Sequence, residues 1–203
     1  LLNRIRLQEA DDQVLRCLNE RYLPGFDPAE EDGYITLTTH NWQARQINEK
    51  RLHALDSPSL AFKAEVKDVF PEYAYPTEAE LVLKRGAQVM FVKNDSAPEK
   101  RYDNGKIGVI TAISREVIEV RGKEDGQLIR VDREEWTNTR YSIEEETKEI
   151  IETIEGTFLQ YPLKLAWAIT IHKSQGLTFD KAIIDPHAAF AHGQVYVALS
   201  RCR

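Results

Sequence analysis

A change of pattern in the middle of the chain constrains the fold more than any other feature. Short apolar runs rich in β-branched residues follow one another there, at residues 89–92, 107–113, 117–120 and 128–131, with glycine turns such as Asn104-Gly105 between them. Short strands joined by tight turns are typical of an antiparallel meander, which commonly closes into a small barrel. The flanking segments follow a different pattern, so we expect one fold interrupted by another.

The N-terminal flank alternates strand and helix signals. Residues 5–23 predict one helix closed by Pro24-Gly25, and residues 34–39 predict a short buried strand. Asn41 is a good helix cap for the apolar spacing of residues 43–55. Strand, polar turn and helix form the repeating unit of an α/β domain.

The same pattern resumes near the C-terminus. Pro162 and Gly176 bracket the run LKLAWAITIHKSQ and predict a helix over it, because proline favours helix starts and glycine helix ends. Residues 182–184 predict a strand, and residues 193–201 predict a closing helix. The acidic stretch after Trp136 fits either a helix face or a returning strand, and we favour the strand.

Composition gives little help with function. The chain of 203 residues has a formal net charge of -6, with 27 Lys+Arg against 33 Asp+Glu, and this argues mildly against a nucleic-acid partner. No apolar run approaches the roughly 20 residues of a membrane span, so we expect no membrane partner. Cys17 and Cys202 have no metal-type spacing, which favours a reducing, cytoplasmic setting.

The stretch Thr170-Ile171-His172-Lys173-Ser174-Gln175-Gly176 is the most informative about chemistry. Hydroxyl, imidazole, ammonium and amide groups precede a glycine that lets a backbone approach a ligand closely, which suits phosphate or nucleotide contacts. A cationic helix end with a glycine cap explains the same residues equally well.

A resemblance to a known protein family favours the first of these two interpretations, contacts to phosphate or nucleotide. The stretch from Thr170 to Gly176, followed by Leu-Thr-Phe-Asp, is similar to motif V of superfamily-one helicases of the PIF/RecD type. Gly193 to Arg201 resembles their motif VI, and Leu37 to Asn41 with Ile47-Asn48 resembles motif IV. Residues 83–90 and the Asn104-Gly105 turn also match the family's pattern, so the resemblance covers nearly the whole chain in family order.

The resemblance implies roles for particular residues. Arg201 matches the arginine finger that reaches the terminal phosphates of ATP, a role for which a permanently charged planar group is suited. Gln175 and Gly176 match the part of motif V that faces the nucleotide. Contacts to single-stranded DNA are implied for five further residues, Thr38, Asn41, Thr170, His172 and Lys173. Helix capping remains an alternative for Asn41, and a satisfied core histidine remains one for His172.

Each tryptophan could either stack on a base or pack in the core. Trp42 lies beside motif IV, where it could stack on a base, while Trp136 and Trp167 lie in apolar surroundings that favour core packing. His187 and His192 have no partner with metal-ligand spacing and are read as loop histidines.

The implied architecture is a RecA-like (P-loop NTPase-type) α/β domain with a parallel sheet, interrupted by a small SH3-like antiparallel β-barrel. We expect the RecA-like domain at residues 1–93 plus 161–203 and the barrel at residues 94–160. The barrel is expected to border the single-strand channel with a basic edge, made of Lys93, Lys100, Arg101 and Lys106.

No G-x-x-x-x-G-K-[ST] phosphate loop occurs in the sequence. The resemblance places that loop, and most contacts to ATP and Mg²⁺, in an N-terminal RecA-like domain of the same protein. The expected function is therefore the C-terminal portion of an ATP-dependent 5′-to-3′ DNA helicase, acting on single-stranded or fork DNA, monomeric and nucleoid-associated, and inactive as a fragment. One alternative is a non-catalytic nucleic-acid-binding protein that keeps the fold, and another is a small α/β enzyme with a site at His172 or His187.

Overall fold

The computed structural model describes residues 1–28, 33–143, 149–185, 189 and 193–202. Its contacts group into two compact units, the first made of Leu1–Glu49 with Trp167–Arg203 and the second of Lys50–Ala166. The second unit begins earlier and ends later in the chain than the expected insertion at residues 94–160, and those domain limits stay an expectation. Within the described ranges, no helix is long and apolar enough to cross a membrane.

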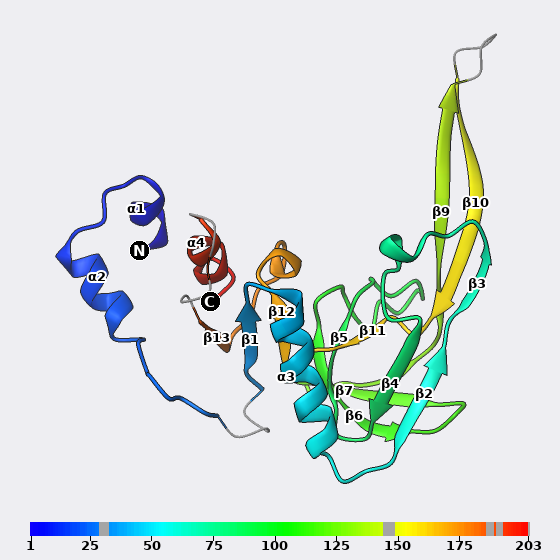
Figure 1. The fold of residues 1–203 in the computed structure, drawn as a ribbon, viewed down its shortest axis with the longest axis horizontal. Coiled ribbons are helices and arrows are strands. Elements are labelled where there is room, and N and C mark those ends of the chain that lie inside the picture. The colour runs from blue at the N-terminus through cyan, green and yellow to red at the C-terminus, as the bar shows by residue number, and fades with distance from the viewer. Residues whose placement is uncertain (29–32, 144–148, 186–188, 190–192, 203) are drawn as a thin grey trace. The chain divides into compact units, whose positions relative to one another are not determined.

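The first unit is built on a small parallel sheet. Strand β1 (Ile35–Thr38) lies between β12 (Ala168–Thr170) and β13 (Ala182–Ile184), and it is parallel to both (Figure 1). Ile35 and Leu37 are fully buried, so the face of β1 on which both side chains lie is covered. The strands predicted at residues 34–39 and 182–184 are thus confirmed.

The first unit also contains helices. They are α1 (Leu2–Arg6), α2 (Asp12–Asn19), α3 (Asn41–Ala54), whose last turn enters the second unit, the 3₁₀ turn η3 (His172–Ser174), and α4 (Gln194–Leu199). The predicted helices over residues 43–55 and 193–201 are confirmed, although α3 already begins at Asn41.

The single helix predicted over residues 5–23 was wrong. Gln8 has a left-handed φ of 60° between α1 and α2, and Asp11 then caps α2 by accepting a hydrogen bond from the Val14 N–H at 3.0 Å. A new cap after a left-handed residue breaks the helix in two.

The helix predicted over LKLAWAITIHKSQ was also wrong. Residues Leu163–Leu165 form β11, which pairs with β5 in the second unit, and the next residues form β12 and η3. Periodicity does not distinguish a short buried strand from a buried helix, and here both strands of the run pair with strands from elsewhere in the chain, β12 with β1 and β11 with β5.

The second unit is made of antiparallel sheets. A five-stranded sheet has the order β11-β5-β6-β7-β8, with β5 (Gln88–Phe91), β6 (Ile107–Ile113), β7 (Ile118–Gly122) and β8 (Leu128–Val131). All the short strands predicted from the glycine-turn pattern are therefore present and antiparallel. Strands β2 (Ser59–Lys63) and β4 (Glu80–Lys84) form a separate pair, and the 3₁₀ turn η2 (Glu72–Ala74) precedes β4.

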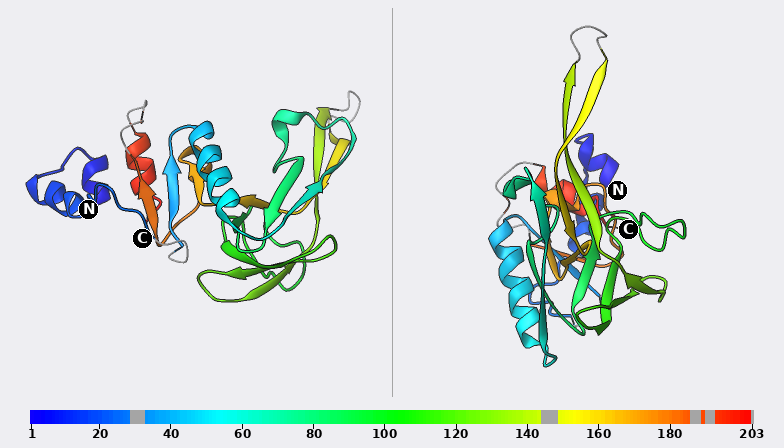
Figure 2. Two further views of the ribbon diagram at one scale, coloured as in Figure 1. Left: turned by 60° about the horizontal axis from the view of Figure 1, so that its bottom comes forward. Right: turned by 90° about the vertical axis from the view of Figure 1, so that its right-hand side faces the viewer.

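A long hairpin completes the second unit. Strands β9 (Glu134–Ile143) and β10 (Ile150–Gln160) pair with each other, β3 (Glu65–Asp68) joins β10, and the hairpin extends away from the rest of its unit (Figure 2). The strand favoured after Trp136 is thus confirmed for residues 150–160, while residues 144–148 of the acidic stretch lie outside the described residues. At the base of the hairpin, Phe158 is fully buried and contacts the Trp136 ring edge-on at 6.0 Å.

Candidate nucleotide and nucleic-acid interface

Two parallel strands of the first unit end side by side. Thr38 and Thr170 are the last residues of β1 and β12 and are register partners, both more than nine-tenths buried. The Thr38 hydroxyl lies 3.2 Å from the His40 carbonyl and 3.3 Å from the Ile169 carbonyl, so it fastens the turn after β1 to the neighbouring strand. Open α/β sheets place ligands at the carboxyl ends of their strands, and these two threonines shape that edge.

A cationic turn follows β12 at this edge. The Ile171 N–H donates to the Thr38 carbonyl at 2.8 Å, and the fully buried Ser174 hydroxyl donates to the Ile171 carbonyl at 2.7 Å. His172 and Lys173 are exposed between these anchors, and within the described residues their side chains have no hydrogen-bond or ion-pair partner. A fixed backbone thus carries two side chains that can donate to phosphate oxygens.

The next residues form a type II β-turn. Gln175 has φ -61° and ψ 132°, Gly176 has φ 81°, and the Leu177 N–H donates to the Ser174 carbonyl at 3.0 Å. The third position of such a turn needs a positive φ, which explains glycine there. Apart from Gly176 and its two chain neighbours, no described residue has a heavy atom within 4 Å of the place where a Gly176 Cβ would be, so the backbone there is open to close approach.

Arg201 is tied to the same segment of the chain. The Phe179 N–H donates to the Arg201 carbonyl at 2.7 Å, and Phe179 forms an isolated parallel bridge with Cys202. The guanidinium donates to the Ser200 hydroxyl, from Nε at 3.2 Å and from Nη2 at 2.9 Å. Among the described residues, no carboxylate pairs with this guanidinium.

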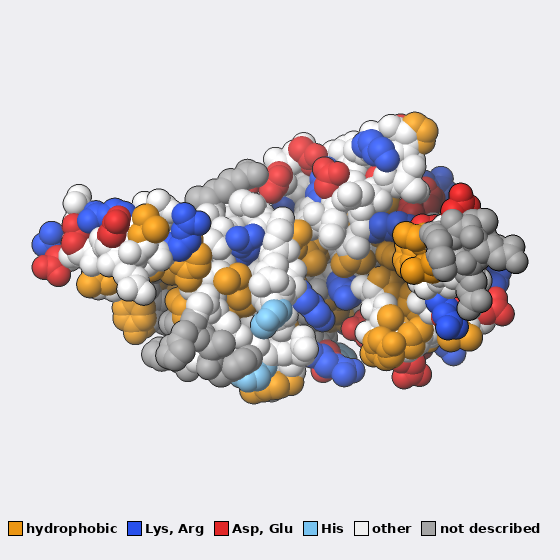
Figure 3. All heavy atoms as spheres, turned by 90° about the horizontal axis from the view of Figure 1, so that it is seen from above, with side chains coloured by type: hydrophobic (Ala, Val, Ile, Leu, Met, Phe, Trp, Pro, Cys, Tyr) orange, Lys and Arg blue, Asp and Glu red, His pale blue; other side chains and the backbone are white. Residues whose placement is uncertain are grey.

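The start of α3 supplies the remaining candidates. Asn41 is exposed at the first position of the helix, and Trp42 is exposed beside it. Figure 3, which looks down on the structure from the top of Figure 1, shows histidine side chains exposed at the surface next to hydrophobic ones. Trp167, by contrast, is buried at 6% exposure, as its apolar surroundings predicted.

Asn48 contributes a contact that sequence reasoning missed. Its side-chain amide donates to the Ala168 carbonyl at 2.8 Å and accepts from the Ala168 N–H at 2.9 Å. Because the Thr36 N–H bonds to the Trp167 carbonyl, strand alternation turns the polar groups of Ala168 away from β1. Asn48 therefore provides hydrogen-bond partners for both backbone groups of Ala168 on the outer edge of β12. Its motif IV position was the only signal in the sequence.

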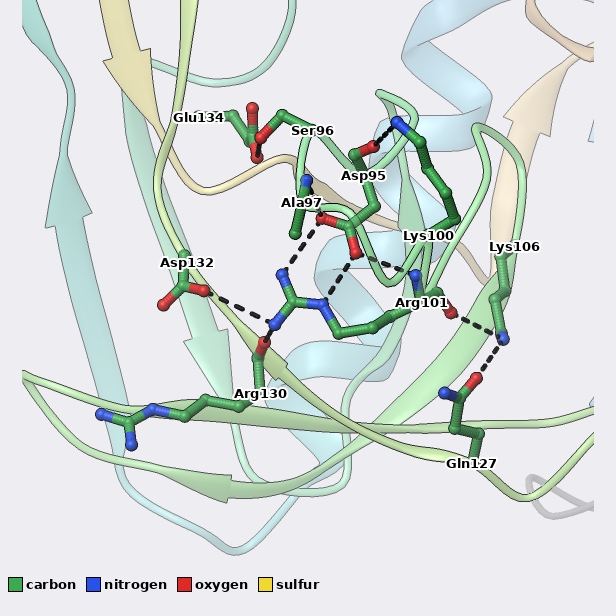
Figure 4. Close-up of polar contacts among 10 residues, drawn as sticks. All are labelled: Asp95, Ser96, Ala97, Lys100, Arg101, Lys106, Gln127, Arg130, Asp132 and Glu134. Atoms are coloured by element: carbon green, nitrogen blue, oxygen red, sulfur yellow. Dashed lines mark hydrogen bonds and ion pairs between the residues drawn. The ribbon is translucent and has the colours of Figure 1, made fainter.

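The four cations of the expected basic edge all have partners within the second unit, and Figure 4 draws Lys100, Arg101 and Lys106 with some of theirs. Arg101 binds the buried Asp95 carboxylate at 2.7 Å, Lys106 binds Asp125 at 2.7 Å, and Lys93 binds Glu134 at 3.1 Å. The Lys100 ammonium donates to the Asp95 carbonyl at 3.0 Å.

Each of these cations would have to give up a protein partner before binding a phosphate. The four therefore stabilise the loop between β5 and β6 and are weak candidates for DNA contacts.

The structure thus gathers Thr38, Thr170, His172 and Lys173 at one strand edge, and it links the Gly176 turn to Arg201 through the backbone of the first unit. In the described part of the chain, no group of three or more His, Cys, Asp or Glu side chains could hold a metal ion. His187 and His192, the loop histidines of the sequence analysis, lie outside the described residues.

Comparisons with known proteins give the family. No family model matches the chain. The ATP-dependent DNA helicase Pif1 of Bdellovibrio bacteriovorus is 33% identical over 208 residues, covering 100% of this chain and 44% of the relative. The crystal structure of Bacteroides sp Pif1 in complex with ADP-AlF4 matches with a TM-score of 0.88 and 41% identity, over 100% of this chain and 45% of that one. The Bacteroides Pif1 complex with ADP-AlF3 and ssDNA matches with a TM-score of 0.74 and 41% identity, over 100% of this chain and 46% of that one.

These matches confirm the α/β, RecA-like fold, with a small antiparallel sheet beside it. The chain spans less than half the length of these relatives. The chain therefore belongs to the PIF1-type helicase family, and its extent is consistent with the C-terminal half of such a helicase.

Proposed function

We propose that the chain is the second motor domain of an ATP-dependent DNA helicase, with an accessory unit attached. The proposal rests on the backbone hydrogen bond between Phe179 and Arg201. This bond connects the segment after the Gly176 turn with the only arginine of the motif VI segment. Two elements with the right chemistry for a nucleotide phosphate are thereby joined by a backbone hydrogen bond within the first unit. The relatives that share this fold include a Pif1 bound to ADP-AlF4.

On the nucleotide side, Arg201 acts as the arginine finger. Its guanidinium can leave the Ser200 hydroxyl, a neutral acceptor, for the stronger charge-assisted bonds of a phosphate. Gln175 and the open backbone of Gly176 approach the same nucleotide. ATP and Mg²⁺ are held mainly by an N-terminal RecA-like domain with a phosphate loop, and Mg²⁺ supplies charge neutralisation there.

On the DNA side, His172 and Lys173 bind phosphates of single-stranded or fork DNA, and Asn41 contacts the same backbone. Thr38 and Thr170 are buried, so they contribute by fixing the edge from which these groups project. None of these groups reads base identity, which suits a motor that steps along any sequence.

The motor moves 5′-to-3′ as a monomer by opening and closing the cleft between its two RecA-like domains. The 203-residue chain alone hydrolyses no ATP, since it has no phosphate loop. Phosphate release above a buffer blank would contradict this part of the proposal.

The DNA side is tested by a salt titration of oligothymidylate binding to the chain. For single strands, log affinity falls by about 0.7 per neutralised phosphate for each decade of salt. Lys173→Gln should therefore weaken binding and flatten the slope by about 0.7. Lys67→Gln, an equally exposed lysine on β3 in the second unit, is the matched control. Equal slopes for both variants would refute the assignment of Lys173.

A further inference from the structure

Trp42 is exposed at the edge where the proposed DNA contacts lie. Its side chain is 62% exposed at the second position of α3, whereas Trp167 is buried and Trp136 packs on Phe158. A large aromatic ring in water gives up apolar burial that a folded chain normally uses. Exposure alone does not mark a site, since Tyr73 is 93% exposed, so the case for Trp42 depends on its place at this edge.

The Trp42 ring contacts the neighbouring ring of His40. The His40 and Trp42 ring centroids are 6.3 Å apart with a 42° tilt, within the range of aromatic contacts. His40 is itself held, because its Nδ1 lies 2.8 Å from the Thr39 hydroxyl. That hydroxyl donates to the Gln43 side-chain oxygen at 3.3 Å, so it accepts from an Nδ1–H of His40.

The contact with His40 leaves most of the Trp42 ring exposed, so a planar ligand can stack on the ring without displacing a packed side chain.

A cation lies one helical turn further on. Arg45 is on the same face of α3, three residues after Trp42, and its side chain is 80% exposed. It pairs with Glu49 at 2.8 Å, an exposed pair that contributes little and that a phosphate can displace. An aromatic platform beside a cation is the combination with which proteins hold single-stranded nucleic acid without reading its sequence.

Trp42 and the cationic turn follow neighbouring strands of the same sheet. The Ile171 N–H donates to the Thr38 carbonyl, so the segments that lead to Trp42 and to His172 leave the sheet side by side. A single strand lying along this edge with its phosphates on His172 and Lys173 has its bases available to a neighbouring ring.

We infer that Trp42 stacks on a base of single-stranded DNA, with Arg45 taking the adjoining phosphate. The inference rests on the proposed function, since it names a further contact to the same strand. Every base has a π-face, so the contact strengthens binding without selecting a sequence.

The test compares two probes, an oligothymidylate of about 16 nucleotides and an abasic strand of equal length and charge. Trp42→Ala should weaken oligothymidylate binding roughly 5- to 150-fold, the range for loss of one stacked base. It should leave binding of the abasic strand unchanged, because no base is present to stack. Trp42→Phe keeps a ring and should retain most of the affinity.

Two control variants distinguish the stacking contact from phosphate contacts and from the loss of any exposed ring. Tyr73→Ala removes a ring that is 93% exposed in the second unit, and it should change neither affinity. Lys173→Gln should weaken binding to both probes, because it removes a phosphate contact. Circular dichroism should show an unchanged fold for Trp42→Ala, since an exposed ring is being removed.

The outcomes are distinguishable. If Trp42→Ala binds both probes like the unaltered chain, or weakens both equally, the stacking role is wrong while the phosphate contacts stand. If the unaltered chain shows no salt-dependent binding to oligothymidylate, the proposed function fails and the stacking role fails with it.

Discussion

Removing the Asp95 carboxylate should destabilise the second unit more than any surface change. Asp95 is 1% exposed, and its carboxylate accepts from the Ala97 N–H at 3.1 Å, the Arg101 N–H at 2.9 Å, and the Arg101 guanidinium at 2.7 and 3.1 Å (Figure 4). One side chain therefore fixes the whole turn after β5. Asp95→Ala leaves the guanidinium without its main partner and two N–H groups without an acceptor.

The magnitude follows from the burial of the pair. Breaking a buried ion pair by removing one member costs about 3–5 kcal/mol. The Arg101 side chain is 24% exposed and keeps the Arg130 carbonyl at 3.1 Å, so we expect the lower end, about 3 kcal/mol.

The assay is urea unfolding of the chain at neutral pH. The control is Arg45→Ala, which breaks an exposed pair with Glu49 and should change the unfolding free energy by no more than about 0.5 kcal/mol. If Asp95→Ala costs no more than this control, the reasoning from burial is refuted.

The same pair predicts a pH dependence. Hydrogen bonds from Arg101 hold the pKa of Asp95 well below its ordinary value of 3.8. A depressed folded pKa means that the stabilisation is complete above the unfolded pKa and is lost as pH falls below about 4. The stability difference between the unaltered chain and Asp95→Asn should therefore shrink on acidification. A difference that stays constant down to pH values at which the chain unfolds would contradict this sign.

Two further predictions concern the first unit. Gly176→Ala should cost about 1–2 kcal/mol in urea unfolding, because a Cβ fits but the φ of 81° does not suit an L-residue, and Gly176→Asn should cost less. An equal cost for both would indicate a clash instead of backbone strain. Asn48→Ala should cost about 2–4 kcal/mol, because it leaves the N–H and C=O of the buried Ala168 unpaired. An effect below about 0.5 kcal/mol would mean that β12 does not depend on this amide.

Local patterns predicted the antiparallel strands well. Each run in the region 107–131 is short, β-branched and followed by a turn, so local propensity and final pairing agree. The run LKLAWAITIHKSQ failed for the opposite reason. Its proline and glycine resembled helix ends, but Gly176 belongs to a type II turn, and pairing partners at Thr36 and Phe91 decided the conformation.

The family resemblance singled out His172, Lys173 and Arg201 as candidate site residues, but it did not show how they are held. The structure exposes His172 and Lys173 on an anchored turn. The Asn48 contact with Ala168 joins residues 120 positions apart, which no local pattern reveals. The same limit affected the basic edge, because sequence shows that Arg101 is cationic but does not show that Asp95 neutralises it.

The central claim is that Arg201 acts on a nucleotide held by another domain. The most direct test is DNA-stimulated ATP turnover by the whole protein that contains this chain, with Arg201→Ala compared with Arg115→Ala, an exposed arginine of the second unit. We predict a loss of roughly a thousandfold or more in kcat for Arg201→Ala, with DNA affinity retained, and no change for Arg115→Ala. Turnover by Arg201→Ala equal to that of the control would contradict the account.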